Sequence, residues 1–284
     1  MENRRPNSIC SRERGFLVEF SFIMYSLIGI VIGILSSMFG FGGGFVVVPI
    51  LYAFLPDSIP SDYLMHTAIG TSLAVMIINS FNSTYNHAKK GNVIWSVFKL
   101  LVGYIAIGSL LGGLLAVYIE SDYLRIAFIG LLIYVLLSNL FKKSFTTEIE
   151  KQTFILPKQR SASFIGIGIG FISTLLGIGG STMTIPYLRN KGMRMINAVA
   201  LATPLGLPIA IVGAITYLIM GMQIEEMSSS NLGFIYLPAL IGFTIGGFIG
   251  VPIGRSWAQK IPDIIFSKIY LILLFIVVII MIIS

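Results

Sequence analysis

The sequence predicts an all-α, polytopic helical membrane protein with about eight hydrophobic segments in two homologous halves. Three observations lead to this fold: the composition, the length of the apolar runs and an internal repeat. Of the 284 residues, 56% are hydrophobic and only 11% are charged, and the mean hydropathy is +0.91. A soluble domain carries roughly 25% charged residues. The composition therefore excludes a water-soluble enzyme, a disordered chain and a disulfide-stapled secreted domain.

Apolar runs long enough to cross a bilayer, about 20 residues each, recur along the whole chain. They are apolar on every face, which argues against packing on a soluble core. The runs cover 16–39 with 45–55, 64–84, 94–119, 124–141, 162–176 with 182–188, 195–219, 233–253 and 264–283. A polar, basic tail is expected over 1–15. A cytoplasmic linker over 142–160 divides a first transmembrane repeat (16–141) from a second (161–284).

The net charge of +7 is distributed unevenly among the loops. Three loops carry acidic residues and neither Lys nor Arg: 56–63, 120–123 and 221–232. The other loops are basic, and the positive-inside rule places them in the cytoplasm. Because 142–160 and 189–194 are both basic, segment 161–188 should enter and leave the membrane on one side, as a re-entrant hairpin or a broken helix. The alternative is eight plain spans, with 189–194 outside.

An internal repeat supports the division into halves. Residues 33–51 align without a gap on residues 170–188. Matched positions include Gly40, Gly42, Gly43 and Pro49 with Gly177, Gly179, Gly180 and Pro186, Ser36 with Ser173, and Gly108 and Gly112 with Gly246 and Gly250. Equivalent loops carry opposite charge, so we expect the repeat to be inverted. Matching halves are typical of secondary transporters, whose substrate site lies at the repeat interface.

The two glycine-rich motifs, Gly-Phe-Gly-Gly-Gly at 40–44 and Gly-Ile-Gly-Gly-Ser at 177–181, should break their helices. Glycine costs about 1 kcal/mol relative to alanine inside a helix. Each motif exposes backbone N–H groups at the start of the following half-helix, where the helix dipole stabilises an anion. Hydroxyls on the next helix would add donors. The expected substrate-binding residues are Gly42, Gly43, Gly44, Thr71, Ser72, Gly179, Gly180, Ser181 and Thr203.

Each of these features also has a purely structural interpretation. Glycine-rich stretches in membrane helices often only permit close packing, and buried hydroxyls and amides often only bond between helices. Asn79 and Asn82 are further candidates for the site, whereas His66 and His87 are expected to be ordinary interface residues near helix ends. No catalytic constellation, metal site or cofactor site is expected, so we do not expect an enzyme.

The paired glycine motifs, each followed by Pro-x-Leu, and the Gly-Thr-Ser at 70–72 resemble the TauE/SafE family of sulfite exporters over about 16–283. Two positions depart from the pattern: Ser181 replaces the last glycine of the second motif, and Ala202 stands where the first half has Gly70. The resemblance implies a multi-pass transporter of the inner membrane for sulfur-containing anions such as sulfite or sulfonates.

We therefore expect a secondary transporter that exports a small sulfur oxyanion or sulfonate by alternating access. A passive anion channel and an uptake permease for another small anion are the alternatives. The expected partners are the small anion and the lipid bilayer, not nucleic acid. The sequence leaves the oligomeric state open, with a homodimer as one option.

Overall fold

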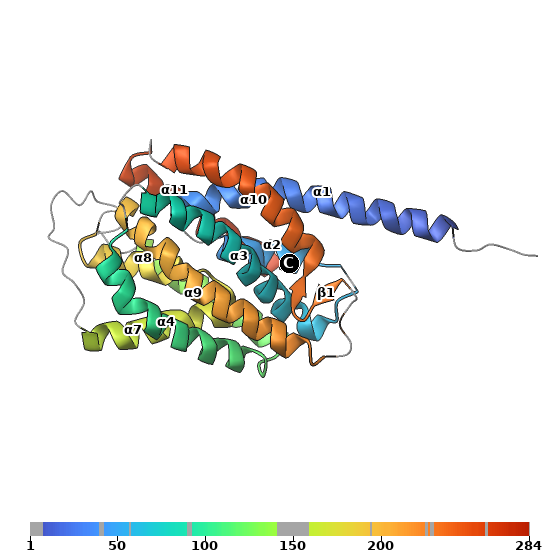
Figure 1. Ribbon diagram of the computed structural model, residues 1–284, viewed down its shortest axis with the longest axis horizontal. Helices are drawn as coiled ribbons and strands as arrows, with labels where there is room; N and C mark the ends of the chain where they lie inside the picture. The colour runs from blue at the N-terminus through green and yellow to red at the C-terminus, as the bar shows by residue number, and fades with distance from the viewer. Residues whose placement is uncertain are drawn as a thin grey trace, which may run out of the picture.

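The computed structural model is a bundle of α-helices (Figure 1). It describes residues 8–39, 43–56, 58–89, 93–140, 159–193, 195–224, 227, 230–258 and 261–283. The helices are α1 (Ser8–Phe39), α2 (Gly44–Phe54), α3 (Leu64–Lys89), α4 (Trp95–Ala116), α5 (Ser121–Leu140), α7 (Gln159–Leu176), α8 (Ser181–Asn190), α9 (Met195–Gly221), α10 (Leu237–Ala258) and α11 (Asp263–Ile283). A 3₁₀ turn, η1 (Ser61–Tyr63), precedes α3. The antiparallel hairpin of β1 (Asn231–Leu232) and β2 (Ile235–Tyr236) precedes α10. The predicted all-α class is confirmed, with this hairpin as a small addition.

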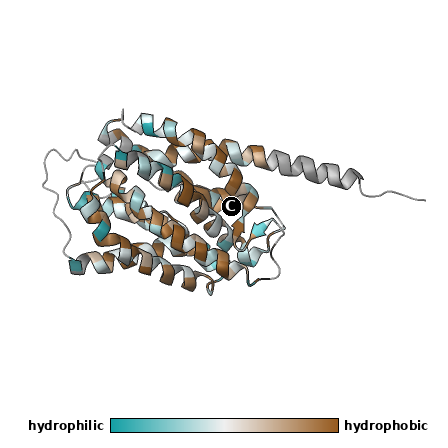
Figure 2. Ribbon diagram, viewed as in Figure 1, coloured by the Kyte–Doolittle hydropathy of each residue, from teal (hydrophilic) through white to brown (hydrophobic). Residues whose placement is uncertain are grey.

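Among the described residues, six helices are long and apolar enough to cross a membrane, and three apolar helices are shorter. The spans are Phe22–Phe39, Ser61–Tyr85, Trp95–Ala116, Ser121–Leu140, Asn197–Gly221 and Leu237–Trp257; the shorter helices are Gly44–Phe54, Ala162–Leu176 and Lys268–Ile283. Apolar side chains also lie on the outside of the bundle, where α4 exposes Leu110, Leu111 and Leu115. Most of the helical ribbon is hydrophobic by residue hydropathy (Figure 2). An apolar exterior over helices, which satisfy their own backbone hydrogen bonds, is what a bilayer requires.

The acidic loops gather at one end of the bundle. Asp62, Glu120 and Asp122 line a single cavity. The hairpin that follows the third acidic loop reaches the same end, because Phe234 stacks on His66 with ring centroids 5.2 Å apart. The helices α4 and α7 start at the opposite end (Figure 1). Among the described residues, the acidic side chains Asp62, Glu120 and Asp122 thus lie at the end opposite the starts of α4 and α7.

Helices α7 and α8 form a hairpin that does not cross the bundle. Gln159, the first residue of α7, lines a cavity together with Lys99 near the start of α4. The helix ends in a glycine cap: Gly177 has φ +65°, and the Ile178 N–H donates to the Ser173 carbonyl at 3.0 Å. The chain then turns back as α8 and joins the start of α9. Both outer ends of the α7–α8 pair thus lie at the end of the bundle where α4 and α9 begin.

Helices α1 and α2 form a similar pair that faces the opposite way. The Tyr25 hydroxyl donates to the carbonyl of Phe54, the last residue of α2, at 2.9 Å. The chain runs from Phe54 directly into the acidic loop that leads to η1. Both outer ends of this pair therefore lie at the acidic end of the bundle.

The closest helix packing joins the first part of the chain to the second. Helix α1 packs along α10, α4 packs along α7, and α3 packs along α9. Glycines bring the backbones together: a Cβ at Gly246 would meet the backbone of Ser26 in α1, and one at Gly108 would meet the backbone of Ile167 in α7. These contacts are the close packing that small residues permit between membrane helices.

Candidate functional site

The two glycine motifs touch each other inside the bundle. A Cβ built at Gly44, the first residue of α2, would lie 2.6 Å from the Gly179 nitrogen and 2.7 Å from the Gly177 oxygen. These glycines are all buried. The two breaks, more than 130 residues apart in the sequence, therefore meet backbone to backbone, at a point where only glycine leaves enough room.

Ser72 of α3 joins the two motifs. Its fully buried hydroxyl lies 3.1 Å from the Gly44 carbonyl and 3.2 Å from the Gly177 carbonyl. One O–H has a single proton to donate, so the two acceptors share it. Ser72 thus holds the motifs together, and its proton is already engaged by protein carbonyls. The sequence predicted the place of this hydroxyl but not its acceptors.

The second motif presents backbone donors at the start of α8. The N–H groups of Thr182 and Met183 turn back to the carbonyls of Gly179 and Gly180, at 3.2 and 3.3 Å. Within the described part of the chain, the N–H groups of Gly179, Gly180 and Ser181 have no backbone acceptor. The positive end of the α8 dipole lies at the same point. This geometry is that of an anion site at a helix N-terminus.

The hydroxyls at the start of α8 are occupied by the motif itself. Thr182 Oγ1 donates to the Gly179 carbonyl at 3.1 Å, and Ser181 Oγ lies 3.5 Å from the same oxygen. Both side chains are 1% exposed. Ser181 therefore makes a long and weak bond that a stronger acceptor could replace.

In the first motif, Gly43 directly precedes α2 and has the left-handed conformation, with φ +98°. A Cβ there would lie 2.9 Å from Ile32 and 3.7 Å from the side-chain amide nitrogen of Asn79. The matched Gly180 instead faces Ile169 and Ile209. The two motifs have related surroundings, except that an amide faces the first and an isoleucine faces the second. The predicted site residue Gly42 lies outside the described residues.

Asn79 and Ile209 also give the depth of the motifs. Each lies near the midpoint of its helix, α3 or α9. Both are buried, with Asn79 only 2% exposed. The motifs therefore lie inside the bundle: Gly43 and Gly180 face the middle of α3 and α9, whereas Gly44 and Gly177 meet at Ser72, in the part of α3 nearer the acidic end.

The two threonines of the predicted site bond elsewhere. Thr71 Oγ1 accepts the Tyr236 backbone N–H at 2.8 Å, on the side of the β-hairpin. Thr203 Oγ1 donates to the Val199 carbonyl one turn back in α9, at 2.8 Å. Neither side chain has a described hydrogen bond to a glycine motif. Their contribution to a substrate cage remains a prediction.

Two further hydroxyls lie one turn before the glycine breaks. Ser36 and Ser173, which the repeat matches with each other, are each 1% exposed. Neither hydroxyl has a hydrogen-bond partner among the described residues. Buried hydroxyls are normally bonded, so these two matched hydroxyls are further candidates for the site.

Comparison with known proteins identifies the family. A family profile described as "Sulfite exporter TauE/SafE" matches residues 25–281. The chain belongs to the TauE/SafE family. Among its relatives, a "Probable membrane transporter protein" of Haemophilus influenzae is 32% identical over 86% of this chain and 91% of the relative. No solved structure matches.

Two other relatives are also named as probable membrane transporter proteins. One from Methanocaldococcus jannaschii is 32% identical over 83% of this chain and 85% of its own length. One from Bacillus subtilis is 27% identical over 85% and 92%. The family and the names of these relatives indicate a membrane transporter, and the six helices long and apolar enough to span a bilayer are consistent with a multi-pass membrane protein.

Proposed function

We propose that the protein is a secondary transporter that exports a small anion, a sulfur oxyanion such as sulfite or a sulfonate, across the cytoplasmic membrane by alternating access. The observation that carries this proposal is the meeting of the two glycine motifs inside the bundle, where Ser72 of α3 bonds both. A broken helix with free backbone donors is a suitable anion site at that depth. The family to which the chain belongs is described as a sulfite exporter.

The packing supports two inverted halves, the arrangement that alternating access uses. If α1, α2, α3 and α4 of the first half correspond to α7, α8, α9 and α10 of the second, each contact has a counterpart. The packing of α1 on α10 corresponds to that of α7 on α4, and the packing of α2 on α3 corresponds to that of α8 on α9. The α1–α2 hairpin opens toward the acidic end, and the α7–α8 hairpin opens toward the other end. Each hairpin reaches the central site from its own side, so movement of one hairpin would open the site to that side only.

The site contains neutral donors, which suits an anion that must also leave. The candidate donors are the amides at the start of α8, the Ser36 and Ser173 hydroxyls and the Asn79 amide. A buried Lys or Arg would hold a small anion more strongly, because charge-assisted hydrogen bonds are roughly twice as strong as neutral ones. Transport requires release, so weaker donors are the better choice.

The charges at the two ends give the orientation. The end where α4, α7 and α9 begin carries the described basic residues Lys89, Lys99 and Lys191, and the positive-inside rule favours the cytoplasm for that end. The acidic end would then face outward. In this orientation the α7–α8 hairpin is re-entrant from the cytoplasm.

The test is anion counterflow in proteoliposomes. Vesicles loaded with unlabelled sulfite should accumulate labelled external sulfite if the protein is a carrier, whereas a channel gives no accumulation. Gly180→Leu should abolish counterflow, because the added side chain enters the space between the glycine motif and Ile209. Gly103→Leu is the matched control, since a Cβ at Gly103 has no atom within 4 Å. Normal counterflow by folded Gly180→Leu protein would refute the glycine site.

A further inference from the structure

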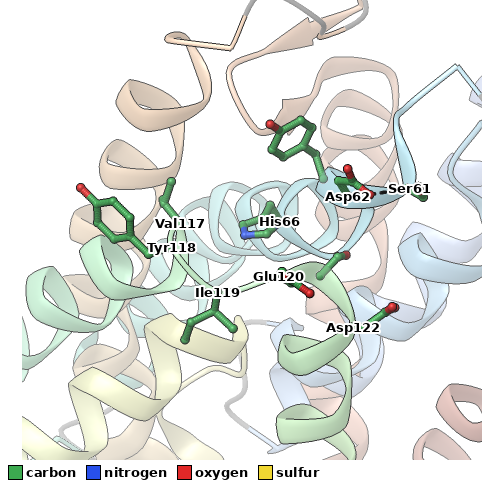
Figure 3. A pocket seen from close by; sticks show the side chains of 10 residues that line it. Ser61, Asp62, His66, Val117, Tyr118, Ile119, Glu120 and Asp122 are labelled. Atoms are coloured by element: carbon green, nitrogen blue, oxygen red, sulfur yellow. Dashed lines mark hydrogen bonds between the residues drawn. The ribbon is translucent and has the colours of Figure 1, made fainter.

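A cavity of about 380 Å³ opens at the acidic end, between the start of α3 and the turn that joins α4 to α5 (Figure 3). Three carboxylate side chains line it: Asp62, Glu120 and Asp122. All three are exposed. As far as the chain is described, the lining contains no Lys or Arg. A cleft lined by charges of one sign concentrates ions of the opposite sign, so this cavity attracts cations.

His66 lies at the base of this cavity, in the first turns of α3 (Figure 3). Its side chain is only 2% exposed. Nε2 lies 3.1 Å from the Ala116 carbonyl, and because a carbonyl only accepts, Nε2 carries the proton. In the neutral ring, Nδ1 then carries a lone pair. This nitrogen is buried and has no hydrogen-bond partner among the described residues.

The surroundings of His66 hold the ring in place and provide negative charge. Phe234 stacks on the ring at 5.2 Å, and Tyr63 meets its edge at 6.1 Å. The titratable groups that face His66 across the cavity come from η1, from the turn after α4 and from the start of α5: they are Asp62, Tyr63, Tyr118, Glu120 and Asp122. None of them is cationic. A proton on Nδ1 would thus lie at the base of a cavity whose described lining carries three carboxylates and no cationic side chain.

The same helix connects His66 with the glycine motifs. Ser72, which bonds both motifs, follows His66 by six residues, or about 9 Å along an α-helix. The preceding residue, Met65, donates its backbone N–H to Ser121 Oγ at 2.8 Å, which ties this turn of α3 to α5. A change in the hydrogen bonding of His66 can therefore shift α3, the helix whose Ser72 bonds both glycine motifs.

We propose that His66 is a proton-binding site, loaded through the acidic cavity, and that its occupancy is coupled to anion movement at the glycine motifs. The proposal rests on the transport function proposed above and names its coupling ion. Protonation adds an N–H at Nδ1 and a positive charge at the ring, and it breaks no covalent bond. The proton comes from water in the cavity and, in each cycle, leaves to water on the opposite side of the membrane, so one proton crosses for each anion moved.

The test uses reconstituted full-length protein under a pH gradient of one unit, with the membrane potential held at zero by potassium and valinomycin. The probes are sulfite and, in parallel, methanesulfonate, whose charge does not change between neutral and mildly acidic pH. Coupling to one proton should produce an anion ratio across the membrane of about tenfold, since one pH unit is equivalent to about 1.4 kcal/mol. The accompanying proton movement is read with a lumenal pH dye.

His66→Gln should reduce this ratio to one while retaining exchange at equal pH. Glutamine can still donate to the Ala116 carbonyl but cannot take up a proton. His87→Gln, at the second histidine of the sequence, is the control and should keep the tenfold ratio. A tenfold ratio in His66→Gln overturns the proposal. A wild-type protein that exchanges anions but gives a ratio of one also overturns it and leaves the transport function standing. A wild-type protein that exchanges neither probe overturns both.

A second variant keeps the test decisive if His66→Gln loses all exchange. The combination of Asp62→Asn, Glu120→Gln and Asp122→Asn leaves His66 intact and removes the negative charge of the cavity. The tenfold ratio should then require a more acidic outer compartment than in the wild type. An unchanged pH dependence in this variant overturns the proposal.

Discussion

Replacement of Gly44 by alanine tests the contact between the two glycine motifs. The added Cβ would lie 2.6 Å from the Gly179 nitrogen and 2.7 Å from the Gly177 oxygen. Ordinary contact begins at 3.4 Å. Because both neighbours are backbone atoms, no side chain can rotate away. The motifs must move apart by about 0.7–0.8 Å, and overpacking of this kind typically costs about 1–3 kcal/mol.

We expect Gly44→Ala to lower the temperature of thermal unfolding in detergent and to reduce sulfite counterflow by about tenfold, the equivalent of about 1.4 kcal/mol. Gly103→Ala is the matched control, because its Cβ has open space around it and alanine is favoured in a helix by about 1 kcal/mol. Gly180→Ala should have an intermediate effect, since its nearest neighbour is the flexible end of Ile209. The reasoning is refuted if Gly44→Ala matches Gly103→Ala in both measurements.

Three further variants test separate contacts, each by thermal unfolding of purified protein. Ser72→Ala removes the one O–H shared by the two motif carbonyls. The buried carbonyls are left without a donor, which should lower the free energy of unfolding by about 1–3 kcal/mol; unchanged stability would show that the bridge is not formed. Arg125→Met removes the guanidinium bonds to the Met281 carbonyl, at 2.9 and 3.3 Å, and should cost about 1–2 kcal/mol, because the group is only partly buried; equal unfolding temperatures would contradict this bond. Gly112→Ala places a Cβ against the backbone of α7, whereas the Cβ of the control Gly168→Ala meets open space. The first variant should therefore be destabilised by about 1–3 kcal/mol and the second should not. Similar stabilities of the two variants would exclude tight packing of α4 on α7.

The sequence predicted the elements whose cause is local. Each predicted apolar segment corresponds to a helix or to a pair of helices, because length and hydropathy alone determine this in a bilayer. The helix break at Gly177 also follows from the local sequence, since a left-handed cap favours glycine. The duplicated motif predicted a site shared by two distant breaks; the structure brings the two motifs into contact, and their role as a substrate site stays a prediction.

The hydrogen-bond partners could not be predicted, because they depend on which backbone lies opposite. Ser72 was expected to face an anion and instead bonds two carbonyls. Arg189, expected in a basic loop, is 2% exposed in the last turn of α8. His66 was expected to be an ordinary interface residue, and only the fold places it under three carboxylates. Its single sequence signal is its position one turn after Asp62.

Because helices of the first part of the chain pack on helices of the second, the order of synthesis determines when each contact can form. The face of α1 that carries Gly29 and Gly33 packs against α10. About 200 residues are synthesised between the end of α1 and the start of α10, which at cellular rates of translation takes about 10–40 s. During that time α1 lies in the bilayer with Gly29 and Gly33 facing lipid or another protein instead of α10. Helix α4, in contrast, meets α7 much sooner. The newly made chain therefore has a waiting period in which an insertion factor, or a second nascent copy, can occupy the face of α1.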